Sequence, residues 1–448
     1  MLLFSAFSKV INATHQKGNT IVLALSGGVD SRVMLELLGA YKQKNPNNRY
    51  CAVHIHHGLS PNAEEWVSKC EMWCAEVGIP LAVEQVRLNL GSQVSIEQEA
   101  RDKRYQALSK HINHGDTLLT GQHLSDQTET FLLALKRGSG PKGLSSMPEQ
   151  TSFGLGKIVR PLLRISRDEI VRYAKKSNLD WVEDESNQDD KFDRNFLRNN
   201  ITPLLNERWP HIESAISRSA DLCAQQELLL EELLADKLQG MVSEDQSISV
   251  SALSAQSELA RNHLLRLWLA QNGWLMPSQK QLGKIWTEVA LSKADANPKL
   301  NYTSGEIRRY KDRLYMVESH ADVSQWKKKI KIDEQIELPD SLGSLELKRS
   351  DSDNCLRLPR ENEELWVTFN PEGLSAHPID RGHSRSLKKL FQEYGVPSWL
   401  RRRIPILMVD DRVAAVVGLF ADKAFSGQDC ELVWNKMNQG VKTPDQNK

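Results

Sequence analysis

The sequence contains few cysteines, and they lack the spacing that cysteine-based architectures require. Its 448 residues include six cysteines, and no two of them are separated by just two residues. A small disulfide-stapled secreted domain is excluded by this length, and a zinc knuckle lacks its cysteine pairs. We therefore expect reduced thiols in a cytoplasmic enzyme.

Long apolar segments and a net charge are also missing. The first residues show no basic segment followed by a sustained apolar stretch, and no run approaches the ~18 apolar residues that a membrane span needs. We expect neither export nor membrane insertion. The 58 basic residues balance 58 acidic ones. A neutral total does not exclude RNA binding, because such binding follows local patches of charge.

The N-terminal part shows the alternation of an α/β fold. Hydrophobic residues make up 40% of the chain and charged residues 26%, which is typical of a globular protein. Short apolar runs alternate with helical patterns, and this order predicts a parallel sheet with helices on both faces. The predicted strands are residues 21–25, 51–55, 81–86, 117–120 and 158–163.

The character of the chain changes twice after this α/β region. Helical patterns at 215–238 and 259–270 predict a small helical domain, with no clear strand beyond a short run at 247–250. Short strands return among turns from about residue 326. We predict three domains: a catalytic α/β domain at 1–212, a helical domain at 213–325 and an α+β domain at 326–448.

A strand, a tight turn and a helix start follow one another in the segment from Leu23 to Ser31. Gly27 and Gly28 let the backbone approach a ligand closely, and the next helix offers free N–H groups and a positive dipole end. This combination favours phosphate binding. Asp30 would repel phosphates unless a cation lies between, so it fits either a Mg²⁺ ligand or a helix cap.

The form of this turn is specific. No Gly-Lys-Ser or Gly-Lys-Thr occurs, so the ordinary Walker A loop is absent. A capped Gly-Gly turn is the structural alternative to a phosphate site. Ser-Gly-Gly-Val-Asp-Ser after an apolar strand, however, resembles the PP-loop ATP pyrophosphatases, which cleave ATP between its α and β phosphates and transfer AMP. The resemblance implies ATP binding by Ser26, Gly27, Gly28, Val29, Asp30 and Ser31.

Further motifs extend the resemblance over nearly the whole chain, which is similar to the tRNA(Ile)-lysidine synthase family. In chain order they are Val53-His-Ile-His-His-Gly-Leu-Ser60, Glu97-Gln-Glu-Ala-Arg-Asp-Lys-Arg-Tyr105, Thr120-Gly-Gln-His-Leu-Ser-Asp-Gln-Thr-Glu-Thr130, Lys136-Arg-Gly-Ser-Gly140, Asp184-Glu-Ser-Asn187, Arg194-Asn-Phe-Leu-Arg198 and Gly395-Val-Pro-Ser-Trp-Leu-Arg-Arg-Arg403.

The resemblance assigns histidines and aspartates to the nucleotide pocket. We expect His57 and His123 to bind ATP, with a metal cluster and a helix cap as the respective alternatives. Asp30 and Asp126 are the expected Mg²⁺ ligands. The sequence departs from the family pattern at Ser125, where the family commonly has a first aspartate of a pair. Metal binding would then depend on Asp126.

Basic residues supply the remaining functions that the resemblance implies. Arg101 and Arg194 are expected to contact phosphate or stabilise charge on the activated base, although pairing with nearby acids is an alternative for each. Together with Asp30 and Asp126 they are the predicted catalytic residues. Lys136 and Arg137 begin a flexible loop that could close over the phosphates or bind RNA.

The C-terminal region concentrates positive charge. Seven basic residues and one acid, Glu393, lie between Arg381 and Arg403. A solvated charged face is the common outcome for such a run, but within this family pattern it indicates tRNA contact. Trp399 is expected to anchor the domain core. The predicted phosphate contacts are Lys388, Lys389, Arg401, Arg402 and Arg403.

The family resemblance implies a specific reaction. The substrates would be ATP with Mg²⁺, free L-lysine and a tRNA(Ile) with the anticodon CAU, whose wobble cytidine becomes lysidine. Two other functions stay open: a PP-loop tRNA thiolase, for which Cys70 and Cys74 would have to be reactive, and a non-catalytic tRNA-binding protein. The oligomeric state is not specified, and a homodimer is compatible with the sequence.

Overall fold

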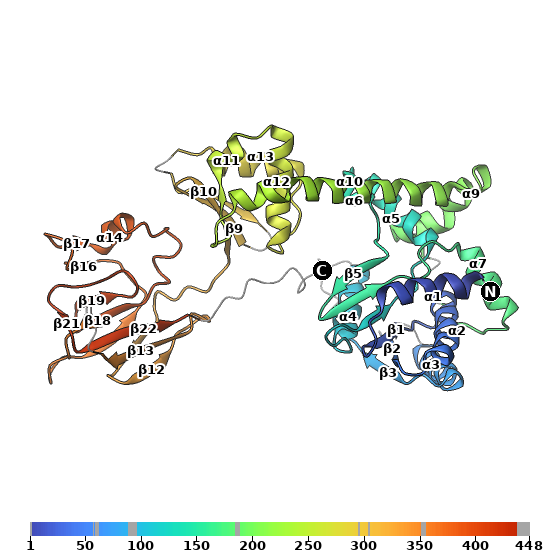
Figure 1. Ribbon diagram of the computed structural model, residues 1–448, viewed down its shortest axis with the longest axis horizontal. Coiled ribbons are helices and arrows are strands. Elements are labelled where there is room, and N and C mark those ends of the chain that lie inside the picture. The colour runs from blue at the N-terminus through green and yellow to red at the C-terminus, as the bar shows by residue number, and fades with distance from the viewer. Residues whose placement is uncertain are drawn as a thin grey trace. The chain divides into compact units, whose positions relative to one another are not determined.

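The computed structural model describes residues 2–56, 58, 62–87, 96–183, 189–293, 296–302, 305–350 and 355–436. The chain divides near residue 235 into two compact units (Figure 1). This division falls within α10 (Ile212–Met241). The three-domain division at 212 and 325 stays a prediction.

A six-stranded sheet forms the centre of the first unit, in the order β3-β2-β1-β4-β6-β5. The first five of these strands pair in parallel, as predicted, whereas β5 pairs antiparallel with β6. The predicted strand at 158–163 is shorter than expected, and the short polar β5 before it was not predicted. The strands are β1 (Thr20–Ala24), β2 (Arg49–His56), β3 (Leu81–Gln85), β4 (Thr117–Leu119), β5 (Gln150–Phe153) and β6 (Gly156–Val159).

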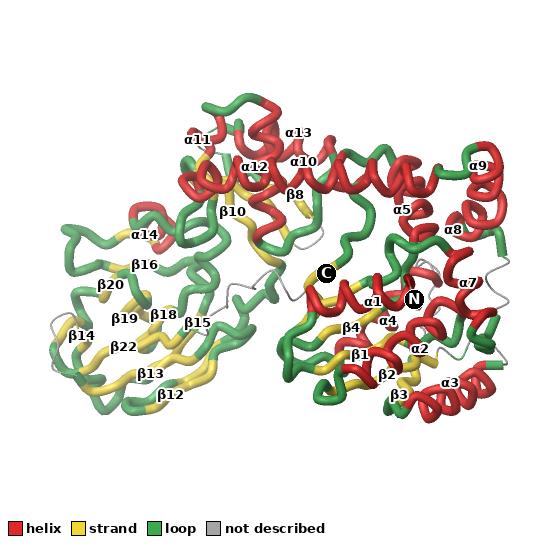
Figure 2. The backbone as a smooth tube through the Cα atoms, turned by 45° about the vertical axis from the view of Figure 1, so that its right-hand side comes forward, coloured by secondary structure: helices red, strands yellow, loops and turns green. Residues whose placement is uncertain are grey.

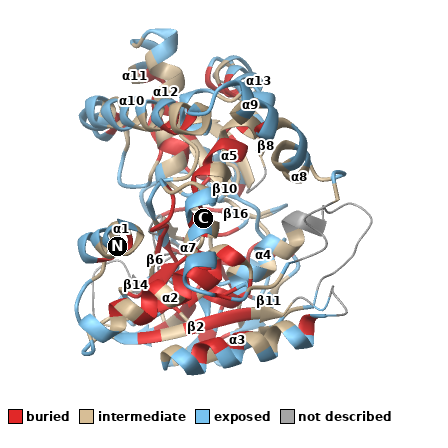
Figure 3. Cartoon of the chain, turned by 90° about the vertical axis from the view of Figure 1, so that its right-hand side faces the viewer, coloured by how far each residue is buried: buried red, intermediate tan, exposed pale blue. Residues whose placement is uncertain are grey.

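Helices cover both faces of this sheet, which confirms the predicted fold class. One apolar cluster joins the sheet to α1 (Leu2–Thr14), α2 (Val29–Lys44), α3 (Ala63–Val77) and α7 (Arg167–Lys176). A second cluster joins the other face to α4 (Ile96–Ser109). Figure 2 shows α1, α2 and α3 beside β1 to β3, and Figure 3 shows how strongly α2 and the strands are buried.

The end of the first unit is helical and lies next to the carboxyl edge of the sheet. Contacts join α5 to each of the three short helices that precede α10. The helices are α5 (Leu124–Lys136), α6 (Pro141–Leu144), α8 (Asp193–Phe196), the π-helix η2 (Leu197–Ile201) and α9 (Thr202–Arg208).

The second unit begins with helices and with a sheet of which the sequence indicated only the short run at 247–250. The helices are α11 (Val250–Ser254), α12 (Glu258–Gln271), α13 (Gln279–Lys284) and the π-helix η3 (Ile285–Ala290). The antiparallel strands are β7 (Ile248–Ser249), β8 (Lys299–Tyr302), β9 (Gly305–Tyr310) and β10 (Arg313–Glu318). The prediction of a helical region is wrong for residues 299–318, which contain β8, β9 and β10, whereas the short run expected at 247–250 contains β7. Charged residues that pair across these strands, such as Lys299 with Glu306, weaken the apolar alternation that reveals a strand.

Two five-stranded sheets follow, and an apolar core that includes Leu347 and Val367 joins them. One sheet contains β11 (Lys327–Lys329), β15 (Leu365–Thr368), β18 (Ile406–Val409), β19 (Arg412–Val416) and β20 (Phe420–Ala421). The other contains β12 (Glu334–Glu337), β13 (Ser344–Arg349), β14 (Cys355–Leu356), β21 (Ser426–Gly427) and β22 (Cys430–Asn435). The pair β16 (Ser375–Ala376) and β17 (Arg385–Ser386) leads into α14 (Leu387–Glu393), so the predicted α+β character is confirmed.

Among the described residues, no helix combines the length and the apolar character that crossing a membrane requires.

Candidate functional site

The turn between β1 and α2 is held by one buried hydroxyl. The Ser31 Oγ accepts hydrogen bonds from the backbone N–H groups of Ser26 at 3.2 Å and Gly27 at 3.1 Å, and it donates to the Gly28 carbonyl at 3.0 Å. The loop thus closes on the first turn of α2. The positive end of the helix dipole and the free N–H groups of that turn remain directed at the same point, as an anion site requires.

Gly27 is required by both backbone conformation and space. Its φ is +89°, a left-handed value that residues with a Cβ rarely adopt. A Cβ at this position would also lie 2.9 Å from the Cγ2 of Val182, whose N–H donates to the Gly27 carbonyl at 2.9 Å. Gly27 is therefore required for packing as well as for the turn, since Val182 lies directly against it.

Asp30 lies in the first turn of α2 and faces α5. Its Oδ1 is buried without a hydrogen bond among the described residues and lies 3.7 Å from the Nε2 of His123. Burial raises the pKa of Asp30, His123 opposes that rise, and nearby Asp126 adds to it. A carboxylate that is buried and short of partners is well suited to a cation.

His123 connects the phosphate turn to α5. Its Nδ1 accepts a hydrogen bond from the Ser125 N–H at 3.2 Å and so caps the helix. Because Nδ1 is an acceptor, the proton of the neutral ring belongs on Nε2, which faces Asp30 at 3.7 Å and Asp126 at 3.4 Å. The expected cap and the expected site residue are therefore the same side chain.

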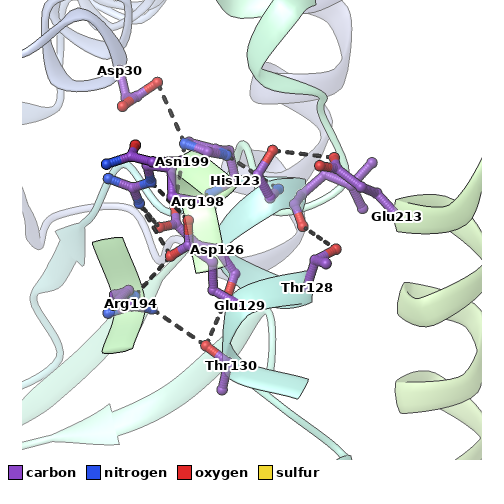
Figure 4. Close-up of polar contacts among 12 residues, drawn as sticks. Asp30, His123, Asp126, Thr128, Glu129, Thr130, Arg194, Arg198, Asn199 and Glu213 are labelled. Carbon is purple, nitrogen blue, oxygen red and sulfur yellow. Dashed lines mark hydrogen bonds and ion pairs between the residues drawn. The ribbon is translucent and has the colours of Figure 1, made fainter. Parts of the chain in front are cut away.

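A buried carboxylate organises the arginines of this site (Figure 4). Glu129 is fully buried and accepts hydrogen bonds from the Nε atoms of Arg194 at 2.8 Å and Arg198 at 2.7 Å. Arg198 also donates a hydrogen bond to the Oδ1 of Asp126 at 3.2 Å. The other oxygen of Asp126 accepts a hydrogen bond from the backbone N–H of His123 at 3.0 Å. Burial opposes the charge of Arg198, but Glu129, Asp126 and Asp30 together raise the pKa of Arg198.

Ser125, where the sequence departs from the family pattern, has a partner of its own. Its hydroxyl donates to Glu213 of α10 at 3.1 Å, and Asn206 donates to the other oxygen of Glu213 at 3.1 Å. A carboxylate at position 125 would face Glu213 with like charge. The serine at 125 is thus matched to an acid that lies 88 residues further along the chain.

Buried polar atoms that lack a hydrogen bond among the described residues gather where the parallel strands end. Because the order β2-β1-β4 reverses direction along the chain at β1, the crevice beside β1 is the expected ligand site of such a sheet. A polar ligand there would satisfy groups that the described residues leave without a hydrogen bond. These atoms are Asp30 Oδ1, His56 Nε2, Thr120 Oγ1, Gln122 Oε1 and Arg160 Nε.

The structure brings most of the predicted pocket residues together, but not all of them. Asp30, His123, Asp126 and Arg194 belong to the connected set described above. Arg101 is exposed on α4, with its guanidinium 5.2 Å from the Tyr105 ring centre. His57 lies outside the described residues, as do Asp184 and Glu185.

Two functional residues were missed or undervalued in the sequence. From the sequence, no function is assigned to Glu129 or to Arg198, although both lie in motifs that carry the family resemblance. A signal was present, because Asp126 and Glu129 are three residues apart and Arg194 and Arg198 four apart, so each pair shares a helix face. Reading the acidic and basic faces as complementary would have suggested this network.

The predicted RNA-binding residues differ in how far the protein already engages them. Lys136 pairs with Asp193 at 2.6 Å, and Arg137 is exposed at the end of α5. Lys388 and Lys389 are exposed on α14, and no ion pair within the described part of the chain involves them.

The three C-terminal arginines have partners within the second unit. The Nε of Arg401 donates to the Val396 carbonyl at 3.1 Å, and exposed Arg402 pairs with Glu372. Arg403 is buried and donates to the Asp340 carboxylate at 2.8 Å, which gives it a structural role within the unit. Their contact with RNA stays a prediction.

Trp399 packs among residues of the preceding antiparallel sheet. Its ring lies 6.2 Å from that of Tyr310 and 5.3 Å from that of Tyr315, and the Arg308 guanidinium lies 5.6 Å from it. Trp399 is therefore packed, as expected, but against β9 and β10, and it is not part of the apolar clusters of the C-terminal sheets.

Comparison with known proteins gives matches along the chain. Residues 4–205 match a PP-loop domain, residues 248–315 a TilS substrate binding domain, and residues 365–437 a TilS substrate C-terminal domain. A tRNA(Ile)-lysidine synthase from Vibrio vulnificus is 56% identical, and one from Photobacterium profundum is 51% identical. Each alignment covers 97% of this chain and 99% of the relative.

A solved structure also aligns with part of the chain. The U34-tRNA thiolase NcsA from Methanococcus maripaludis, determined with its [4Fe-4S] cluster, is 19% identical and covers 50% of this chain and 78% of its own, with a TM-score of 0.40.

Asp30 should make folding stability depend on pH. Because burial raises its pKa, its stabilising contribution is complete below the ordinary value of 3.8 and is lost as the pH rises through the folded-state pKa. Asp30→Asn cannot ionise, so we expect it to unfold at a higher temperature than the wild type near neutral pH. The difference should shrink as the pH falls toward 3.8.

Thermal unfolding across this pH range measures the effect. Asp411→Asn is the matched control, because Asp411 is exposed. An Asp30→Asn protein that is less stable than the wild type near neutral pH would contradict the expectation.

Proposed function

This chain belongs to the tRNA(Ile)-lysidine synthase family, and we propose that it joins lysine to the wobble cytidine of a tRNA(Ile) with the anticodon CAU. The observation that carries the proposal is similarity along nearly the full length to relatives of that name. The family resemblance expected from the sequence is thereby confirmed. The phosphate turn and the crevice of unpartnered polar groups support ATP chemistry at the end of β1.

The first step would activate the base. The C2 carbonyl oxygen of the cytidine attacks the α-phosphorus of ATP, the bond to the β-phosphate oxygen breaks, and pyrophosphate leaves. The N–H groups of residues 28–31 and the α2 dipole offset phosphate charge, and Ser31 holds the turn in shape through the N–H groups of Ser26 and Gly27. Arg194, positioned by Glu129 and by Thr130 at 3.3 Å, adds a fixed positive charge, and we assign the same task to Arg101.

The second step would form the new bond. The ε-amine of free L-lysine attacks C2 of the adenylated base, the C2–O bond breaks, AMP leaves, and the attacking nitrogen loses a proton. Adenylation makes this step favourable because it turns a poor leaving group into AMP. The product base is lysidine, which pairs with A rather than G and so changes decoding and charging from methionine to isoleucine.

The acidic residues near the turn fit a Mg²⁺ ion. Mg²⁺ typically binds one or two protein carboxylates together with substrate phosphates, and it would supply charge neutralisation at the phosphates. Asp30 suits this task because its Oδ1 has no hydrogen bond among the described residues. Both oxygens of Asp126 already accept from His123 and Arg198, so Asp126 would have to exchange one of these contacts.

The remaining parts of the proposal concern nucleotide, partners and location. We assign His57 and His123 to the nucleotide pocket. Exposed Lys388 and Lys389, loop residues Lys136 and Arg137, and Arg401 and Arg402 are the proposed tRNA contacts. Arg403 belongs to this set by its position in the basic run, although it already pairs with Asp340. We propose a cytoplasmic location, where tRNA, ATP and lysine meet, and a homodimer stays a prediction.

The reaction is tested by its products. With ATP, L-lysine and tRNA(Ile) carrying CAU, the protein should release AMP and pyrophosphate and form lysidine, and other amino acids should not replace lysine. Asp30→Ala should lower AMP release by at least about a hundredfold, because charge stabilisation at the phosphates is lost. Its tRNA affinity should stay within about twofold of the wild type, since Asp30 is not among the predicted RNA contacts.

Asp411→Ala serves as the active control. An Asp30→Ala enzyme with normal turnover would contradict the proposed role of Asp30 at the phosphates. Wild-type protein that binds tRNA yet releases no AMP would favour the non-catalytic alternative.

Cys70 and Cys74 separate the proposed enzyme from a thiolase. Both thiols are buried in the α3 core, and burial raises the pKa of each to about 12, which disfavours the reactive thiolate. Replacing both by alanine should leave lysidine formation within about twofold, at a cost of about 1–3 kcal/mol in unfolding free energy. Turnover and denaturant unfolding measure the two effects. Loss of turnover in a protein that still folds would revive the thiolase.

Lysines and arginines of the basic C-terminal run should behave differently. The double variant Lys388→Ala with Lys389→Ala should weaken tRNA binding about tenfold and lower the slope of log Kd against log salt by about one to two, without changing stability. Arg403→Ala should instead cost about 1–3 kcal/mol of unfolding free energy, because it removes a buried side chain together with its hydrogen bonds to Asp340. Filter binding and thermal unfolding give both readouts. An Arg403→Ala protein of normal stability that loses more tRNA affinity than the lysine variant would contradict this division.

A further inference from the structure

Arg160 is a buried cation that the described residues do not neutralise. It follows β6 at the carboxyl edge of the sheet and is 6% exposed. Its Nη1 donates to the Pro148 carbonyl at 2.7 Å, while its Nε has no hydrogen bond within the described part of the chain. None of the ion pairs among the described residues involves it.

The other buried arginines in the described part of the protein face carboxylates. Arg32 lies within 3.6 Å of Glu36 and 3.7 Å of Glu76, and Arg403 donates to Asp340. A buried charge typically costs several kcal/mol unless an opposite charge compensates it. Arg160 departs from this rule, which indicates that its counter-charge comes from a bound molecule.

A second cation lies on the same side. Along β6, Ile158 belongs to the α4 face and Val159 to the α2 face, so the alternation of a strand directs Arg160 to the α4 face. There the Tyr105 ring packs on Phe153 at 5.7 Å and beneath the guanidinium of Arg101 at 5.2 Å. Burial lowers the pKa of Arg160, Tyr105 offsets part of this, and the positive charge of Arg101 lowers it further. Two cations on one face create an attraction for an anion.

Hydrogen bonds within the protein hold Arg160 in place without a bound ligand. The loop that accepts its Nη1 hydrogen bond is fixed by Gln127 of α5, which exchanges two hydrogen bonds of 2.9 Å with the Met147 backbone. The Arg160 N–H also donates to the Glu149 carbonyl at 2.9 Å. A planar guanidinium held in this way suits the oxygens of a phosphate.

We propose that Arg160 forms a phosphate site for the tRNA substrate, next to the nucleotide that is modified, and that Arg101 only adds positive charge to this face from its exposed position on α4. The inference rests on the proposed function, because it takes tRNA as the substrate. Strand β4 lies between β1 and β6, and neighbouring strands are ~4.8 Å apart, so Arg160 is offset ~10 Å from the phosphate turn across the sheet. Its anion is therefore separate from the ATP phosphates that the turn holds.

Arg160→Met tests the site, because methionine keeps much of the volume and removes the charge. Equilibrium binding of tRNA(Ile) is measured over a range of salt concentrations, and binding of ATP is measured separately. We expect tRNA binding to weaken about tenfold and the salt slope to fall by about 0.7–0.9, with ATP binding within about twofold. The thermal unfolding temperature should equal or exceed that of the wild type, because an uncompensated buried charge is removed. Arg164→Met is the matched control, since Arg164 is exposed and pairs with Asp221 at 2.8 Å.

Each outcome decides the inference. Unchanged tRNA binding overturns it, and so does weaker ATP binding with normal tRNA binding, which would assign the phosphate to the nucleotide. If Arg160→Met fails to fold, Arg160→Lys is tested instead, because lysine keeps the charge but lacks the planar guanidinium. We then expect a loss of tRNA affinity smaller than tenfold. An Arg160→Lys protein with unchanged tRNA affinity would overturn the proposed site. Wild-type turnover is read in parallel. If tRNA binding depends on Arg160 but the wild-type protein releases no AMP, the proposed function is wrong and the phosphate site stands. If the wild-type protein forms lysidine but its tRNA binding does not depend on Arg160, only the phosphate site is wrong.

Discussion

The buried Glu129 carboxylate is the interaction on which the rest of the site depends. It fixes two guanidinium groups that come from 65 and 69 residues further along the chain. Through Arg198 the same network continues to Asp126, then to His123, and from His123 to Asp30 beside the phosphate turn. A charge buried this deeply is stable only while its partners stay in place, so the carboxylate holds the helices after residue 189 against α5.

A second constraint is the concentration of unsatisfied groups where the parallel strands end. Buried polar atoms without partners cost free energy, and most proteins avoid them. Here several lie along one edge of one sheet, from Asp30 beside β1 to Arg160 after β6. These groups lower the free energy of unfolding of the ligand-free protein, and a charged, polar ligand bound there would raise it again. Such a trade-off between stability and function is common at binding sites.

The C-terminal basic run shows that a charge count is a weak guide to a binding surface. Several of its arginines are engaged within the second unit, by Glu393, Glu372 and Asp340. The lysines of α14 differ because the buried faces of the helix, at Leu387, Leu390 and Phe391, direct Lys388 and Lys389 outward. Which charges are free for RNA thus follows from folding.

The sequence by itself determined the parallel α/β domain, the phosphate turn and the family, because these depend on local features: alternating apolar runs, a Gly-Gly turn before a helix, and motifs in a given order. It did not reveal strands β8 to β10, whose charged residues hide the strand pattern. The helical spacing of the acids and arginines is compatible with the Glu129 network but does not pair them, and nothing in the sequence indicates the partner of Ser125 or the isolation of Arg160. Each of these depends on which side chains meet across long stretches of chain, and only the tertiary structure decides whether a buried charge finds its partner or leaves a place for a ligand.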